Sequence, residues 1–227
     1  MPSTPETTSA SDRRIGIRLG PRGVAPRVIA ALRTLGYSLI DPDVTPDMTD
    51  SRVWLVDADR FGELPSVDAA PDLRVLLIAP PSVDALSDPR IIAQTPRPGR
   101  LSSVYAMVQT ALERTPRKCP RIPTRLSARC IRSDRRSIGA VLSLSEGGCL
   151  LRTRESLRKG AKLDVQFALP DYGLVSTRAE CVYTRRGDAG LSFATPPPDV
   201  RFTIAHFITH QLANKMDSDL FAQASSA

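Results

Sequence analysis

Short apolar runs alternate with segments of helical periodicity in the first half of the chain. Runs that predict strands lie at residues 15–19, 38–40, 53–56, 73–79 and 91–94. Apolar residues recur every three or four positions in residues 28–35, which end before Gly36, and in residues 101–112. This alternation predicts an α/β domain with an open, mostly parallel sheet over residues 14–113. The stretches 60–72 and 80–90 are short and interrupted by proline, so stunted helices are expected there.

The hydrophobic period changes to two in the second half. Apolar and polar residues alternate through residues 137–144 and 162–170. Further short strands are predicted at residues 125–132, 148–153, 175–184 and 189–194. The pattern predicts an all-β, six-stranded antiparallel barrel followed by a C-terminal helix, which Asp199 is expected to N-cap.

These patterns divide the chain into two domains. The first covers residues 14–113, and the barrel with its helix covers residues 125–215. Residues 114–124 are polar, basic and rich in proline, which predicts a linker or tether. Residues 1–13 are expected to be a disordered tail, and residues 216–227 a second tail.

Charge is distributed unevenly between the two domains. The 227 residues carry 31 Lys and Arg against 24 Asp and Glu, a formal net charge of +7. Residues 1–112 have a net charge of −1 and residues 113–227 have +8. Residues 115–136 alone hold eight basic residues and one acid. The positive potential is therefore local, and 27 of the 31 basic residues are arginines, whose planar guanidinium groups bind phosphates and stack on rings.

The composition excludes several classes of protein. No run approaches the ~18 apolar residues that span a bilayer, and the first residues lack the apolar core of a signal peptide. The four cysteines show neither CxxC nor zinc spacing, so reduced thiols, a cytoplasmic location and no metal are expected. His206 and His210 are four residues apart, without a plausible third ligand. With no HExxH motif or Walker loop, the chain is predicted not to be an enzyme.

Two motifs lie close together around the start of the barrel. Arg117 and Arg121 form an RxxxR on the tether, and residues 143–148 read SLSEGG at the end of a predicted strand. Guanidinium groups can fork onto phosphate or onto the Hoogsteen edge of guanine. Glycines allow the backbone to approach a ligand closely. Together the motifs indicate a site for an anionic purine nucleotide.

Residues 115–214 resemble the PilZ domain, the bacterial receptor for cyclic di-GMP, whose signature is RxxxR followed by (D/N)xSxxG. The resemblance implies a ligand site for cyclic di-GMP made of Arg117, Lys118, Arg121, Arg125, Ser143, Ser145, Gly147 and Gly148. Ser143 departs from the family pattern, because it stands where the family has Asp or Asn and can make only a single hydrogen bond of that kind. Residues 121–125 form a second RxxxR, so Arg125 is a further candidate.

The first domain is similar to a two-component receiver in the order of its elements. Asp57 lies at the end of the third predicted strand, where a receiver has its phospho-acceptor. The acidic pair expected after the first strand is missing, Ala79 replaces a hydroxyl residue, and Arg97-Pro98 replaces Lys-Pro. Without those carboxylates little would hold the Mg²⁺ of phosphoryl transfer. We therefore expect a degenerate receiver that is not phosphorylated and that serves protein contacts.

The sequence thus predicts a cyclic di-GMP-binding signalling effector that reorients or reshapes itself for an unidentified protein partner, which it contacts through the first domain. The resemblance implies outputs such as motility, biofilm formation or virulence, and leaves homodimerisation open. One alternative is an adaptor of PilZ type that does not bind nucleotide. A second is a nucleic-acid binder that uses residues 115–136. Because these residues have no interleaved aromatics and no recognisable helix–turn–helix, no specific nucleic acid is expected.

Overall fold

The computed structural model describes residues 13–44, 51–80, 87–133 and 135–224. The chain divides into two compact units, residues 1–118 with 212–227, and residues 119–211. Of the tail predicted for residues 1–13, only the last residue is described.

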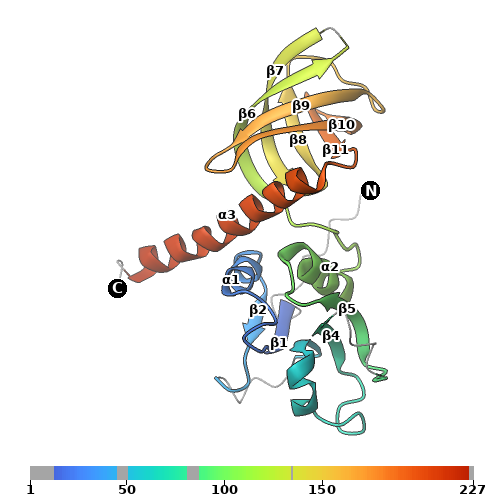
Figure 1. Cartoon of the computed structure of the whole chain (residues 1–227), viewed down its shortest axis with the longest axis vertical. Coiled ribbons are helices and arrows are strands. Elements are labelled where there is room, and N and C mark those ends of the chain that lie inside the picture. Colours follow the sequence, from blue (N-terminus) through green and yellow to red (C-terminus); the bar gives the residue numbers. More distant parts are fainter. Residues whose placement is uncertain (1–12, 45–50, 81–86, 134, 225–227) are drawn as a thin grey trace, which may run out of the picture. The chain divides into compact units, whose positions relative to one another are not determined.

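The first unit contains a five-stranded parallel sheet (Figure 1). Its strands are β1 (Arg14–Arg18), β2 (Ser38–Ile40), β3 (Val53–Asp57), β4 (Arg74–Ala79) and β5 (Ile91–Pro96). They follow the order β2-β1-β3-β4-β5, and every neighbouring pair is parallel. The direction of travel across the sheet reverses between β1 and β3, as in doubly wound folds. The predicted parallel α/β domain is confirmed.

Protein covers both faces of this sheet, which is why every residue of β3 is buried. Helices α1 (Pro26–Thr34) and α2 (Leu101–Leu112) contact each other, and α2 also contacts β4 and β5. Trp54, Val56, Leu73 and Val75 form a buried apolar cluster, against which Phe61 and Leu64 pack. A 3₁₀ helix, Ala58–Glu63, is the short element that replaces a full helix after β3. Most of the stretch 80–90 lies outside the described residues.

The second unit is a closed barrel (Figure 1). Its six strands are β6 (Ile122–Arg132), β7 (Arg135–Ser145), β8 (Gly148–Thr153), β9 (Lys162–Leu169), β10 (Gly173–Arg185) and β11 (Asp188–Phe193). The order around the barrel is β10-β11-β8-β7-β6-β9, with antiparallel neighbours throughout. The predicted period of two is explained by inward-facing side chains such as Leu163, Val165 and Phe167, which are buried. The predicted six-stranded barrel is confirmed.

Three element boundaries differ from the sequence prediction. Strand β6 begins at Ile122, inside the predicted tether of residues 114–124, because its first two residues already pair with β7. Helix α3 (Pro198–Ala224) starts with a proline, whose fixed φ suits the first helical position, so Asp199 lies in the first turn and is not the N-cap. The helix also runs through most of the predicted tail of residues 216–227, since no glycine or proline interrupts it. Among the described residues, no helix is both long and apolar enough to cross a membrane.

Candidate functional site

One end of the barrel brings the Ser/Gly motif beside the second arginine of the tether. Ser145 ends β7 and pairs with Gly148, which begins β8. On the other side of β7, Leu144 pairs with Ile122. Continuing this register by one residue places Arg121 level with Ser145. Arg121, just before β6, thus lies in one row with Ser145 of β7 and Gly148 of β8, and we call this the motif end of the barrel.

Within this row, the serine and the last glycine shape the hairpin. Ser145 is 4% exposed, and its hydroxyl donates a hydrogen bond of 3.0 Å to the carbonyl oxygen of Gly148. A Cβ atom on Gly148 would lie 2.1 Å from the carbonyl oxygen of Leu191 in β11, so only glycine fits. A Cβ atom on Gly147 would meet nothing within 4 Å. Gly148 therefore permits close strand packing, whereas Gly147 borders open space.

The arginine of the row is available to solvent. Arg121 is exposed and forms no ion pair with another described residue. Burial, and next the nearby Cys130 thiol, raise the pKa of the Cys149 thiol to about 12, while the Arg121 guanidinium acts in the opposite direction. This influence on Cys149 agrees with a position of the guanidinium beside the start of β8.

Two further predicted ligand residues lie on the strands next to this row. Ser143 is half-buried and pairs with Pro123 and Leu150. Arg125 is exposed and lies where the register between β6 and β7 shifts. Arg121, Arg125, both serines and both glycines of the prediction therefore belong to one unit.

The basic run of residues 115–136 does not form a single patch. Strand β6 has 11 residues, and at about 3.3 Å per residue its two ends lie roughly 30 Å apart. Arg121 precedes the strand and Arg132 ends it, so their charges lie at opposite ends of the barrel. Basic residues that are close together in the sequence therefore lie on two separate surfaces of the barrel.

The first tether arginine belongs to the other unit. The backbone N–H of Arg117 donates a hydrogen bond of 3.0 Å to Oε1 of Gln109 in α2. Gln109 is 6% exposed, and its Nε2 donates to the hydroxyl of buried Tyr37 at 2.6 Å. The side chains of Arg117 and Lys118 are exposed. The structure therefore anchors the tether by its backbone and leaves both basic groups in solvent.

Gln109 is a residue that the sequence analysis missed. It lies in an otherwise apolar stretch of α2 whose periodicity was assigned wholly to the core. A lone amide on the buried side of a helix needs hydrogen-bond partners, which is the signal that could have identified it.

The carboxyl edge of the parallel sheet holds the predicted phospho-acceptor position. The side chain of Asp57 is 1% exposed, and Nη2 of Arg97 is bonded to its Oδ1. Nη1 of Arg97 donates to Oδ2 of Asp59 at 2.9 Å, and this hydrogen bond holds the pKa of the Asp59 carboxyl below its usual value. Asp57 is thus engaged in an internal ion pair with Arg97.

Two glycines close the space around Asp57. A Cβ atom on Gly23 would lie 2.5 Å from Oδ2 of Asp57, and one on Gly20 would lie 3.2 Å away. The N–H of Gly99 donates to the carbonyl oxygen of Gly23 at 2.8 Å, which joins the loops after β1 and β5. Ligands of doubly wound sheets bind outside the carboxyl ends of the strands, where the strand order reverses. In this protein, atoms of the loops after β1 and β5 occupy the space outside the carboxyl ends of the strands and pack against Asp57.

Most of the cysteines are buried, and the two histidines pack against an aromatic ring. All four cysteines are free, Cys119 is half-buried, and the other three are buried. Burial raises the pKa of the Cys130 thiol to about 11. The rings of His206 and His210 lie 5.6 and 6.1 Å from that of Tyr172. Among the described residues, no group of three His, Cys, Asp or Glu side chains could hold a metal ion.

Comparison with known families identifies the barrel. The family described as PilZ domain matches residues 115–210, which include the tether, all six barrel strands and the first part of α3. Residues 115–210 are a PilZ domain. Both motifs of the sequence analysis lie inside the PilZ domain, while the parallel sheet lies outside the matched range.

Several solved structures are similar to part of the chain. The inhibitor of motility of Bacillus subtilis is 14% identical over 44% of this chain and 53% of its own length, with a TM-score of 0.40. The PilZ domain of YcgR from Escherichia coli, solved with c-di-GMP, is 13% identical over 47% and 98%, with a TM-score of 0.39. The MrkH–c-di-GMP complex of K. pneumonia is 19% identical over 49% and 54%, with a TM-score of 0.35. No curated protein matches the sequence.

Proposed function

We propose that this protein is a receptor for cyclic di-GMP and that its PilZ domain binds the dinucleotide at the motif end of the barrel. The observation that carries the proposal is the row of Arg121, Ser145 and Gly148. It places an exposed guanidinium, which has no ion pair among the described residues, beside the hairpin of the family motif. An arginine without an internal partner can give its full set of donors to a ligand.

The chemistry of the ligand assigns a role to each group. Arg117 and Arg121 fork onto guanine and phosphate, and each charged hydrogen bond contributes about 1.5–3 kcal/mol. The remaining predicted ligand residues add charge, single hydrogen bonds or access to the backbone. They are Lys118, Arg125, Ser143, Ser145, Gly147 and Gly148. Ser145 acts chiefly through the hairpin that its hydroxyl stabilises, while Gly147 leaves room for the ligand.

Arg117 also gives ligand binding a route to the first unit. Its backbone is bound to Gln109, and its guanidinium is exposed. A ligand that orders residues 115–124 around itself changes the conformation of this segment and therefore the environment of Gln109 and Tyr37. The binding free energy is thereby converted into a shift between conformations that a protein partner senses.

For the first unit we propose a degenerate receiver-like domain that contacts a partner or a second copy of the chain. The strand order β2-β1-β3-β4-β5 is the flavodoxin-like order also found in receivers. The ion pair with Arg97 and the packing of Gly20 and Gly23 leave Asp57 without the open, acidic surroundings that phosphoryl transfer requires. This domain is proposed to act through its surface.

Calorimetric titration of cyclic di-GMP into the full chain tests the receptor. The wild type is expected to bind with micromolar affinity or better, and the Arg117→Ala, Arg121→Ala double variant to lose binding. The control is the Arg33→Ala, Arg52→Ala double variant, which removes two exposed arginines from the first unit and is expected to bind like the wild type.

The result separates the proposed receptor from the adaptor. If the wild type does not bind, the receptor proposal is wrong and an adaptor remains, with Ser143 as the departure that cost the ligand. If both double variants weaken binding equally, general electrostatic attraction explains the affinity and the site assignment is wrong.

A further inference from the structure

Three loops gather basic residues at the end of the barrel opposite the motif end. They are residues 132–133 and 135–136 at the connection between β6 and β7, residues 153–160 after β8, and residues 184–188 between β10 and β11. The registers Gly139↔Thr153 and Arg152↔Asp188 bring them to the same end. We call these three loops the hairpin end of the barrel.

The charge of the hairpin end is not neutralised by the acids that the structure describes there. Its two described acids are already paired, Glu155 with Arg132 at 3.8 Å and Asp188 with Arg152 at 2.8 Å. Seven other basic residues form no ion pair with a described residue, namely Arg135, Arg136, Arg154, Arg158, Lys159, Arg185 and Arg186. All seven are exposed. Such concentrated, uncompensated charge produces a strong local positive potential.

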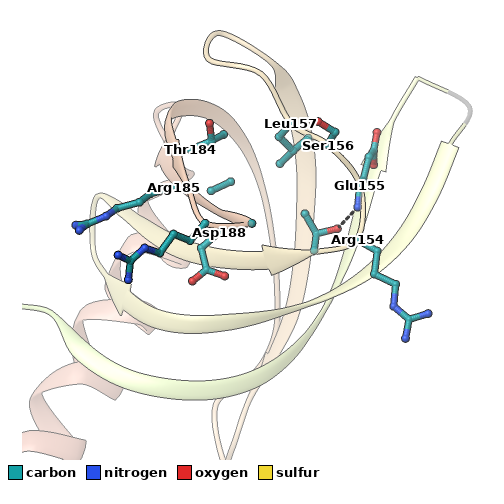
Figure 2. A pocket seen from close by; sticks show the side chains of 11 residues that line it. Arg154, Glu155, Ser156, Leu157, Thr184, Arg185 and Asp188 are labelled. Carbon is teal, nitrogen blue, oxygen red and sulfur yellow. Dashed lines mark hydrogen bonds between the residues drawn. The ribbon is translucent and has the colours of Figure 1, made fainter.

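A shallow depression of about 360 Å³ lies between two of these loops. Residues 153–157 line one side of it and residues 184–189 the other. Figure 2 shows Arg154 and Arg185 extending outward on opposite sides of the depression. The guanidinium groups therefore surround an open surface and do not converge on a single point.

This arrangement suits an extended polyanion better than a single ion or an acidic protein. A site for one phosphate would direct several donors at one position, whereas these charges lie on three loops. A protein partner is usually held by aromatic or large apolar anchors. The depression offers none, since its one large apolar lining residue, Leu157, is 7% exposed. The exposed Ile138, Val182 and Tyr183 lie on β7 and β10, outside its lining. Arginine forks match phosphate geometry.

The hairpin end is also separate from the proposed cyclic di-GMP site. Gly148 begins β8 and Thr153 ends it, so the two surfaces lie at opposite ends of a six-residue strand, about 17 Å apart along the strand. One surface can therefore be altered without changing the residues of the other.

We propose that the hairpin end binds the phosphate backbone of nucleic acid without reading its sequence. The arginines of the three loops contact phosphates on neighbouring turns or strands, and the release of counterions supplies the affinity. This surface differs from the run of residues 115–136 considered from the sequence, because only its last residues contribute, together with two loops that are distant in sequence.

Fluorescence anisotropy of a labelled 30-base-pair duplex, measured with the full chain at several salt concentrations, tests the proposal. The Arg154→Ala, Arg185→Ala, Arg186→Ala triple variant is expected to bind at least about tenfold more weakly than the wild type at low salt. The slope of log K against log salt should fall by about 2 to 3, because three phosphate contacts are lost. Two duplexes of unrelated sequence should bind equally.

Two control variants identify the cause of a loss. The Arg33→Ala, Arg52→Ala, Arg129→Ala variant removes three exposed arginines elsewhere and is expected to change affinity less than about threefold. Replacing Arg154, Arg185 and Arg186 by lysine keeps the three positive charges, so the slope of log K against log salt should equal that of the wild type. Both hairpin-end variants should keep the far-UV circular dichroism spectrum and the urea midpoint of the wild type, which shows that the barrel is folded whether or not it binds cyclic di-GMP.

Three outcomes would overturn the proposal. The wild type fails to bind duplex at low salt, or the two alanine triple variants weaken binding equally. In the third outcome, polyglutamate of matched charge binds the wild type as tightly as the duplex does, and this binding is lost in the Arg154→Ala, Arg185→Ala, Arg186→Ala variant. That result would identify an acidic protein as the partner.

Discussion

The carboxyl edge of the parallel sheet and the motif end of the barrel both place charged side chains beside glycines, and they use them in different ways. At the sheet edge, Arg97 is bonded to buried Asp57, and Gly23 packs against the same carboxylate. At the motif end, Arg121 is exposed without an ion pair among the described residues, and Gly147 borders open space. The charges of the first site are paired with each other, and Arg121 at the second is open to solvent.

This difference shows why the type of residue alone does not identify a binding site. Each surface has the residues that a ligand site of its fold requires, arginine or aspartate near glycine. What separates them is whether the charged groups are buried and paired with each other. Asp57 and Arg97 form a buried ion pair, even though Oδ2 of Asp57 and Nε of Arg97 have no hydrogen-bond partner, whereas Arg121 is exposed.

The largest expected effect concerns the ion pair at the sheet edge. Arg97→Met leaves the buried Asp57 carboxylate without its partner and should lower the free energy of unfolding of the first unit by about 3 kcal/mol. The same change in the barrel, Arg121→Met, should cost less than about 0.5 kcal/mol, because that side chain is exposed. Urea denaturation followed by circular dichroism measures both.

A double variant shows whether the loss comes from the unpaired charge. Adding Asp57→Asn to Arg97→Met should recover more than half of the lost stability, because the buried group is then neutral. Equal losses in the Arg97 and Arg121 variants would contradict the distinction between the two sites.

An intermediate effect concerns the two glycines of the barrel motif. Gly148→Ala forces a Cβ atom against the Leu191 carbonyl and should destabilise the barrel by about 2 kcal/mol. Gly147→Ala meets open space and should change stability by less than about 0.5 kcal/mol. If Gly147→Ala weakens cyclic di-GMP binding while stability is kept, the open space at this turn is used by the ligand. Equal stability losses in both variants would mean that the hairpin packs differently.

The smallest expected effect concerns the anchor of the tether. Gln109→Met removes the hydrogen bonds to Arg117 and Tyr37 and should lower the stability of the first unit by about 1 kcal/mol. Limited trypsin digestion should cleave after Arg117 and Lys118 several-fold faster in this variant, because the backbone of the tether is released. A cleavage rate equal to that of the wild type would show that Gln109 does not restrain the tether.

Most of the fold could be predicted because its signals are local. The run at residues 38–40 coincides with β2, and the periodicity of residues 101–112 coincides with α2. The alternation of apolar and polar residues at 162–170 predicted β9 correctly, because one face of each barrel strand is buried. The boundary of β6 differs because its first residues gain partners on β7, whereas the two ends of α3 follow from local signals, the proline at its start and the lack of glycine or proline up to Ala224.

The sites could be predicted only in part, because their chemistry depends on contacts distant in sequence. Arg121 and Ser145 could be predicted as site residues, since a family signature marks them, and their role stays a prediction. The pairing of Asp57 with Arg97 joins residues 40 positions apart. The hairpin end was missed because its arginines come from three loops that only the barrel brings together. Such groupings follow from the strand registers, which the sequence pattern does not specify.

Trp54 gives the protein a built-in optical reporter. It is the single tryptophan of the chain, it is 8% exposed in the core of the first unit, and its indole N–H donates to the carbonyl oxygen of Ser51 at 2.8 Å. Emission excited near 295 nm therefore comes from the sheet unit alone, whatever binds to the barrel. A change in emission wavelength on addition of a barrel ligand, or in intensity after correction for the absorption of the ligand itself, would record communication between the two units.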